Sequence, residues 1–256
     1  MSGRFAQANN LDEFWENLLH AKKSISEIPA KRWDWTAYYH PNREEAISQG
    51  KSYSKWGAFL EEFDQFDPLF FQMTPREAEN IDPQERLYLE ECWKALEDAG
   101  YASSKMSTEL RKRTGVFGGI TKQGFHLYST ETTHHFPTTS YSSMVNRVSY
   151  YLNLQGPSMP IDTMCSSAFV AIHEACEYIR NGKGSMAIAG GVNLYTHPLT
   201  YFGLTVGQLI SHTSDSAAFG NGGIGFVPGE GVGAVVLKDY DQAVQDRDHI
   251  YAVIRG

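Results

Sequence analysis

The sequence has few cysteines, no long apolar run and fewer basic than acidic residues. Its three cysteines are an odd and small number, which argues against a disulfide framework and favours a reducing, cytoplasmic location. No run of about 18 apolar residues occurs, so we expect no membrane-spanning helix. The first ten residues lack the apolar stretch of a secretory signal. With 22 Lys and Arg against 30 Asp and Glu, the net charge of −8 disfavours a nucleic-acid binder that neutralises phosphates.

The residues that are present predict a folded α/β protein. Hydrophobic residues make up 41% of the 256 positions and aromatic residues 13%, which is enough apolar mass for a sizeable core and argues against a disordered chain. This length suits one large domain or two small ones.

The N-terminal third predicts two helices separated by irregular structure. Residues 11–22 place apolar side chains at helical spacing, and residues 27–74 are aromatic-rich but irregular, so we expect loops and short elements packed onto the body. The second helix has Asp82 as N-cap, Pro83 at its first position, Glu85 to complete a capping box and Gly100 as its stop.

The rest of the chain alternates strands and helices. We expect strands over 114–120, 158–164, 186–192, 232–238 and 250–255, and helices over 142–152 and 166–180. This order is typical of an α/β or mixed three-layer domain. The chain opens directly into Gly3, with no strand before it, and closes immediately after a strand, so we expect residues 1–256 to be a domain truncated at both ends.

Cys165 is the candidate for chemistry. It occupies a tight bend between a predicted buried strand and a predicted helix, and the N–H groups and partial positive charge of the helix start favour a thiolate. The same N–H groups could hold an oxyanion when the thiolate attacks a carbonyl. By position alone, a buried structural cysteine remains an alternative. For Cys92 and Cys176, inside helical stripes, the structural role is favoured.

The segment around Cys165 resembles the nucleophile segment of β-ketoacyl synthases. The resemblance rests on Asp162-Thr163-Met164-Cys165-Ser166-Ser167 and on five further stretches in the family's order: Leu11–Leu18, Asp82–Gly100, Asn146–Ser158, Ala189–Asn193 and Gly225–Gly233. It covers essentially the whole chain. Ketosynthase domains of modular polyketide synthases are the most similar, and Met164 with the glycine-rich run Phe219–Gly225 indicates the subtype served by separate acyltransferases.

The resemblance implies a thiolase-like fold layered α/β/α/β/α in the complete domain, of which this chain is the N-terminal half. It implies a decarboxylative Claisen condensation, with Cys165 as nucleophile and Met164 as a candidate substrate-binding residue. The implied partners are an acyl carrier protein, whose phosphopantetheine carries the substrates, a malonyl-type extender thioester and a second copy of the chain, paired through the strand 158–164. No cofactor is expected to bind directly. The family's catalytic histidines and lysine lie in its second half and cannot be assigned here.

Other motifs give weaker signals. Gly220–Gly225 matches G-x-G-x-x-G, but a dinucleotide site needs a strand before it and a helix after it, and neither is predicted there. His134, His135 and His173 lack ligand partners at metal spacing, so we expect no metal site, and His173 is a helix histidine rather than a base. Ile224 and the stretch 211–218 depart from the family's usual residues, which leaves that loop's structure open.

Two functions from different classes remain open at this stage. The first is a condensing enzyme, and the second is a non-condensing domain that only accepts or passes an acyl chain. A hydrolase that uses Cys165 is a distant third. The presence or absence of the family's histidines would separate the first two.

Overall fold

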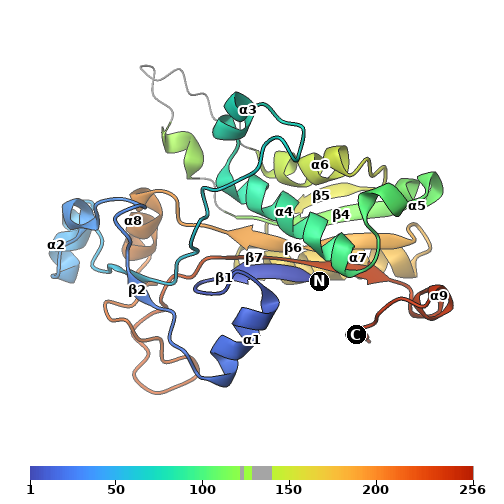
Figure 1. Cartoon of the computed structure of the whole chain (residues 1–256). Coiled ribbons are helices and arrows are strands. Elements are labelled where there is room, and N and C mark those ends of the chain that lie inside the picture. Colours follow the sequence, from blue (N-terminus) through green and yellow to red (C-terminus); the bar gives the residue numbers. More distant parts are fainter. Residues whose placement is uncertain (122–123, 129–139, 256) are drawn as a thin grey trace.

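A mixed five-stranded sheet organises the chain in the computed structural model, which describes residues 1–121, 124–128 and 140–255. The strand order is β1-β7-β6-β4-β5 (Figure 1). The strands of this sheet are β1 Ser2–Phe5, β4 Thr114–Gly119, β5 Ser158–Ile161, β6 Met186–Asn193 and β7 Gly231–Lys238. β4 runs parallel to β5 and β6, whereas β7 runs antiparallel to β6 and to β1.

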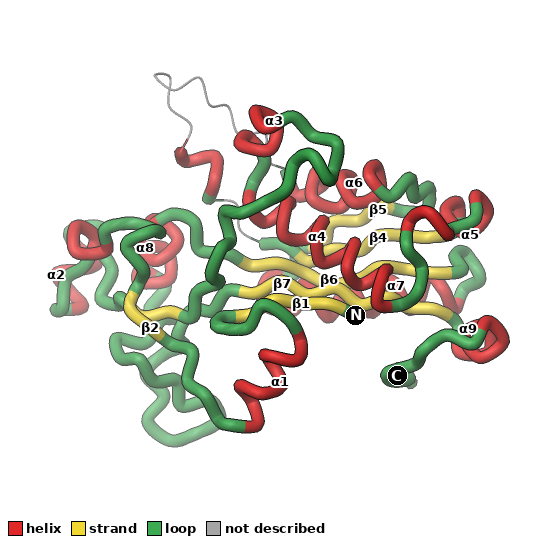
Figure 2. The backbone as a smooth tube through the Cα atoms, in the orientation of Figure 1, coloured by secondary structure: helices red, strands yellow, loops and turns green. Residues whose placement is uncertain are grey.

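Helices cover both faces of the sheet (Figure 2). α4 (Pro83–Asp98) and α6 (Tyr141–Tyr151) cover one face, and α7 (Ser167–Arg180) lies on the other. Successive strand residues point to opposite faces. Val116 and Ile188 accordingly join the core under α4 and α6, while Phe117 and Ala187 join the core under α7. β6 is almost entirely buried, which agrees with the small residues of its sequence.

A smaller lobe packs beside the strand ends and consists mainly of loops. It contains the two-stranded sheet of β2 (Ser26–Glu27) and β3 (Trp56–Gly57), with α2 (Arg43–Ser48) and α8 (Pro198–Val206). Its apolar core comprises Ile28, Trp33, Ala46, Tyr53, Phe59, Tyr195, Tyr201 and Ile210. The aromatic-rich segment is therefore packed irregular structure, as the sequence predicts. The remaining helices are α1 Leu11–Leu19, α3 Pro75–Asn80, α5 Thr108–Lys112 and α9 Tyr240–Asp246.

Three sequence-based expectations about the chain ends and α4 are wrong. Residues 2–5 form β1, because they pair with β7. Residues 250–255 are not a strand, since no described strand pairs with them. The capping box at α4 does not form: Asp82 accepts a hydrogen bond from Gln84 N–H at 2.9 Å, but the Glu85 carboxylate is engaged by α6 instead.

Two further elements are shorter than predicted. The strand expected over 158–164 ends at Ile161, because Met164 and Cys165 turn into a 3-10 helix. The helix expected over 11–22 ends at Leu19 and buries none of its residues. Trp15, Leu18 and Leu19 are exposed along it, and Phe14 packs on Phe5 with ring centroids 4.3 Å apart.

An apolar groove of about 410 Å3 lies beside α7 and the end of β7. Ile172 and Ile179 of α7, Val235 and Leu237 of β7, and the segment 250–254 contribute to its walls. Among the helices in the described part of the chain, none is long and apolar enough to cross a membrane.

Candidate active site

Cys165 lies where β5 gives way to α7, at the edge of the sheet where the parallel strands end. β4, β5 and β6 all run toward this edge. In α/β sheets ligands bind outside the carboxyl ends of the strands. The Cys165 side chain is exposed there, so a thioester from solution can reach it.

The turn that presents Cys165 is held by short side chains. Asp162 Oδ1 accepts a hydrogen bond from Met164 N–H at 3.1 Å. Ser167 Oγ accepts from Thr163 N–H at 2.9 Å and donates to the Met164 carbonyl at 2.6 Å. Met164 has a φ of +57°, a left-handed conformation that is uncommon for a residue with a side chain. The turn therefore depends on its local hydrogen bonds.

Glycines let the start of α7 sit directly on the sheet. A Cβ at Gly119 would lie 2.6 Å from the Ala168 backbone nitrogen, and one at Gly191 would lie 3.2 Å from the Ala168 Cβ. These close approaches fix the helix start against the ends of β4 and β6. Because α7 begins at Ser167, the partial positive charge of its N-terminus lies close to Cys165 in the chain.

Met164 and the other two cysteines fall in different surroundings. Met164 is 68% exposed and directly precedes Cys165 in the chain. Cys92 is buried in α4, and burial raises the pKa of its thiol. Cys176 lies on α7, more than two turns after Cys165, and burial is the main cause of its raised thiol pKa. A raised pKa keeps both of these thiols protonated and makes them poor nucleophiles.

Glu230, which directly precedes β7, makes buried contacts at the same edge of the sheet as Cys165. Its carboxylate pairs with the Arg32 guanidinium at 2.5 Å and accepts from Leu60 N–H at 2.9 Å and from Tyr195 N–H at 2.8 Å. Both charged side chains are almost fully buried. Burial raises the Glu230 pKa to about 6, although Arg32 opposes the shift. Glu230 thus joins the small lobe to the segment that follows β6.

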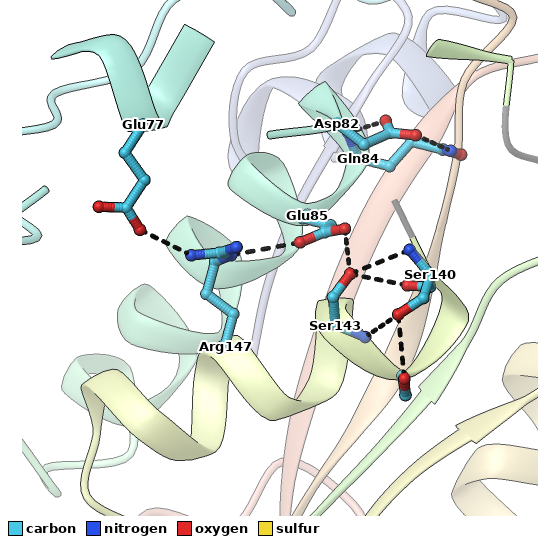
Figure 3. Close-up of polar contacts among 8 residues, drawn as sticks. Glu77, Asp82, Gln84, Glu85, Ser140, Ser143 and Arg147 are labelled. Carbon is cyan, nitrogen blue, oxygen red and sulfur yellow. Dashed lines mark hydrogen bonds and ion pairs between the residues drawn. The ribbon is translucent and has the colours of Figure 1, made fainter. Parts of the chain in front are cut away.

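Polar contacts also fix the start of α6 (Figure 3). Glu85 on α4 accepts from Ser143 Oγ and from Arg147 Nε, the latter at 3.2 Å. Arg147 also pairs with Glu77 at 3.4 Å. Burial raises the pKa of Glu85, while Ser143 and Arg147 oppose the increase. Ser140 caps the helix by accepting from Ser143 N–H at 3.1 Å.

Sequence patterns alone assign no role to Ser167, to Glu230 or to the contacts of Glu85 with α6. The first two lie inside motifs that carry the resemblance, Cys165-Ser166-Ser167 and Gly229-Glu230-Gly231, but their partners lie elsewhere in the fold. His173 is exposed on α7, and no hydrogen bond to the Cys165 thiol occurs within the described residues. His134 and His135 lie outside those residues. Residues 220–225 form a loop between α8 and β7, followed by no helix.

Across the described parts of the chain, no group of three His, Cys, Asp or Glu side chains is placed so that it could hold a metal ion.

Comparison with known proteins decides the family. The sequence profile of "Beta-ketoacyl synthase, N-terminal domain" matches residues 1–243. The chain belongs to the β-ketoacyl synthase family. The polyketide synthase ThaQ of Burkholderia thailandensis is 48% identical over 256 residues, which are 100% of this chain and 12% of that protein. The polyketide synthase PksM of Bacillus subtilis is 47% identical over 268 residues, 100% of this chain and 6% of that protein.

Solved ketosynthases confirm the thiolase-like α/β fold. The oxazolomycin ketosynthase domain OzmH KS7 of Streptomyces albus superposes with a TM-score of 0.91 at 43% identity, covering 97% of this chain and 44% of that one. The ketosynthase from module 6 of the bacillaene synthase of Bacillus subtilis gives a TM-score of 0.87 at 41% identity, covering 98% of this chain and 41% of that one. This ketosynthase chain thus spans less than half the length of the solved domains it matches.

Proposed function

We propose that Cys165 carries the growing acyl chain in a decarboxylative Claisen condensation. The observation that carries this proposal is the exposed cysteine at the turn between β5 and α7, at the carboxyl edge of the parallel strands. Membership of the ketosynthase family and the polyketide synthases among its relatives support the same chemistry.

The first half-reaction transfers an acyl group to Cys165. The thiolate attacks the carbonyl carbon of a thioester carried on the phosphopantetheine of an acyl carrier protein, and the carbonyl oxygen becomes an oxyanion. Backbone N–H groups at the start of α7 stabilise that charge. The intermediate collapses, the carrier thiolate leaves and takes up a proton, and the acyl group remains on Cys165 as a thioester. Met164, exposed beside the sulfur, contacts the acyl chain.

The second half-reaction forms the carbon–carbon bond. A malonyl-type thioester loses carbon dioxide, and its enolate carbon attacks the acyl-Cys165 carbonyl. Cys165 leaves as a thiolate, and the product is a 3-oxoacyl thioester on the carrier. The histidines and lysine that the resemblance implies for this step belong to the family's second half. We therefore propose that residues 1–256 act as the N-terminal part of a longer ketosynthase domain.

The apolar groove beside α7 and β7 supports the proposal that residues 1–256 are one part of a longer ketosynthase domain. Its walls expose apolar side chains of α7 and β7, the kind of surface that a domain covers with another layer. We assign this surface to contact with the second half of the domain.

Pairing with a second copy is proposed through β5, the outer strand of the sheet. Val116 N–H donates to the Pro157 carbonyl at 2.8 Å and Ile120 N–H to the Ile161 carbonyl at 3.1 Å, so residues 157 and 161 face β4. By two-residue alternation, the backbone groups of Ser158 and Pro160 face the free edge.

The proline at this edge disfavours one register. Pro160 has no N–H to donate. A two-fold axis at Pro160 would set two residues without donors opposite each other. An axis at Met159 instead lets Ser158 N–H of each copy donate to the Pro160 carbonyl of the other, which keeps two hydrogen bonds. Met159 is 41% exposed and would then face its own copy.

The experiment that tests the function separates its two half-reactions. The complete ketosynthase domain that carries residues 1–256 is incubated with an acyl thioester, and the mass of the intact protein is measured. We expect one acyl group on Cys165. Malonyl carrier protein is then added, and a 3-oxoacyl product is expected. Acylation without condensation would favour the non-condensing acyl acceptor, and an unacylated protein would overturn both functions.

A further inference from the structure

Ser167 makes hydrogen bonds to both sides of the strained residue that precedes Cys165. Its hydroxyl accepts from Thr163 N–H at 2.9 Å and donates to the Met164 carbonyl at 2.6 Å. Its backbone N–H also donates to the Met164 carbonyl. Ser167 is buried, with a relative exposure of 5% for the whole residue, so water competes little for these bonds. One hydroxyl therefore closes the turn around a residue whose φ is +57°.

The same residue is tied to the sheet. Ser167 begins α7, and a Cβ at Gly119 would lie 2.7 Å from the Ser167 carbonyl carbon and 2.6 Å from the Ala168 nitrogen. This part of the backbone cannot move toward β4. Because the start of α7 is immobile, hydrogen bonds from Ser167 to the turn transmit that fixed position to Met164 and Cys165.

We propose that Ser167 is a positioning residue for Cys165, and this inference rests on the proposed function. Its hydroxyl holds Met164 in the left-handed conformation, so that the Cys165 sulfur stays beside the first N–H groups of α7. Ser167 takes no part in bond making. The Ser167 hydroxyl affects the rate of acyl transfer because the attacking sulfur and the oxyanion donors must stay in a fixed position relative to each other. A shift of about 1 Å can slow a reaction by roughly a hundredfold.

Ser166 provides a matched comparison at the neighbouring position. Its hydroxyl donates to the Thr163 carbonyl at 2.9 Å and lies 3.0 Å from Thr163 Oγ1. It is exposed and makes no hydrogen bond to Met164 within the described residues. The substitution Ser166→Ala therefore also removes one hydroxyl from this turn, but it leaves the hydrogen bonds of Ser167 to Met164 in place.

The test compares the wild-type domain with Ser167→Ala, Ser167→Thr and Ser166→Ala, each in the complete ketosynthase domain. Two rates are measured by intact mass: acyl transfer from butanoyl-N-acetylcysteamine and alkylation of Cys165 by iodoacetamide. We expect Ser167→Ala to slow acyl transfer by about tenfold to a hundredfold. Alkylation depends on the thiolate fraction of Cys165 but uses no oxyanion donors, so its rate should fall less than the acyl-transfer rate, by about threefold at most. Ser166→Ala and Ser167→Thr, which keeps a hydroxyl at position 167, should both leave the two rates close to those of the wild type.

The outcomes separate this inference from the proposed function. If the wild type is alkylated but never acylated, the proposed function and the inference both fail. If Ser167→Ala is acylated as fast as the wild type, or if Ser167→Thr is slowed as much as Ser167→Ala, the positioning role alone is overturned. Thermal unfolding of each variant is recorded, and a Ser167→Ala protein that loses both rates together with its cooperative transition also counts against positioning.

Discussion

Replacing Glu230 by alanine should destabilise the domain more than any change at an exposed ion pair. The substitution leaves the Arg32 guanidinium, whose side chain is 2% exposed, without its carboxylate. It also removes the acceptor for Leu60 N–H and Tyr195 N–H. One guanidinium nitrogen of Arg32, Nη1, already has no hydrogen-bond partner in the described chain, so little is available to replace the lost bond.

The magnitude follows from the burial of the pair. Removing one partner of a buried ion pair costs about 3–5 kcal/mol, because the remaining charge stays desolvated. Domains of ordinary size unfold with a free energy of about 5–15 kcal/mol, so Glu230→Ala should remove roughly a fifth or more of the total. The matched surface pair is Lys55 and Glu27, at 2.5 Å with both side chains partly exposed. Glu27→Ala should cost less than about 1 kcal/mol.

Urea unfolding of the complete domain measures both changes. A double variant, Arg32→Met with Glu230→Leu, should lose less than the two single variants together, because neither charge is left alone in the interior. A loss of less than about 1 kcal/mol for Glu230→Ala, equal to that of a surface pair, would refute the reasoning.

The same carboxyl gives a pH dependence with a definite sign. Burial raises the Glu230 pKa from 4.5 to about 6, so the folded state binds this proton more tightly than the unfolded state. A group of this kind contributes its stability below the unfolded pKa and loses it as the pH rises through the folded value. The free energy of unfolding of the wild type, relative to Glu230→Gln, should therefore fall between about pH 4.5 and pH 6. A rise over this interval would contradict the assignment.

Four further outcomes are expected. Cys165→Ser should abolish stable acyl loading from a thioester, measured by intact mass. A serine hydroxyl is far less acidic than a thiol and therefore a much weaker nucleophile near neutral pH. Met159→Cys should form a disulfide-linked dimer on mild oxidation, since facing residues about 4.5 Å apart between Cα atoms suit a disulfide. Gly190→Ala should cost roughly 3 kcal/mol or more in urea unfolding, because its Cβ would lie 2.0 Å from the Gly233 carbonyl oxygen. Residues 1–256 expressed alone should form no 3-oxoacyl product and should aggregate through the uncovered groove.

Each of these outcomes has a control. Cys176→Ser should keep acyl loading, and labelling that survives in Cys165→Ser would show another nucleophile. Ser158→Cys should cross-link poorly, because it faces residue 160 of the other copy in the proposed register. Gly203→Ala should be neutral or slightly stabilising, since its added methyl group meets no atom within 4 Å. A monomeric, cooperatively melting and soluble fragment that forms product would overturn the proposed division of the domain.

The elements with strong local patterns could be predicted from the sequence. β4, α6, α7, β6 and β7 begin and end within a residue of their predicted bounds, because their periodicity and caps are local. β1 could not be found in this way, since four residues become a strand only through pairing with β7. Residues 250–255 show the reverse case, in which a pattern typical of a strand has no partner.

The candidate site was predictable only in part for the same reason. The motif around Cys165 indicates the bend and the helix that follows it, and the structure places both there. The hydrogen bonds of Ser167 depend on the left-handed Met164, which no propensity predicts. The roles of Glu85 and Glu230 depend on partners that lie far away along the chain, Arg147 for Glu85 and Arg32 for Glu230. The sequence therefore indicates Cys165 as the candidate nucleophile and leaves out the groups that hold its turn.

The pairing of β1 with β7 has a consequence for synthesis of the protein. Ser2 lies opposite Ala234, so β1 leaves the ribosome well before the strand that pairs with it has been made. At about 5–20 residues per second, that interval is roughly 10–50 seconds. During this time residues 2–5 and the apolar side chains of α1 stay available to other partners, including the same segment of a neighbouring nascent chain. Folding of this sheet is therefore completed late, and its N-terminal strand is the part most dependent on protection during translation.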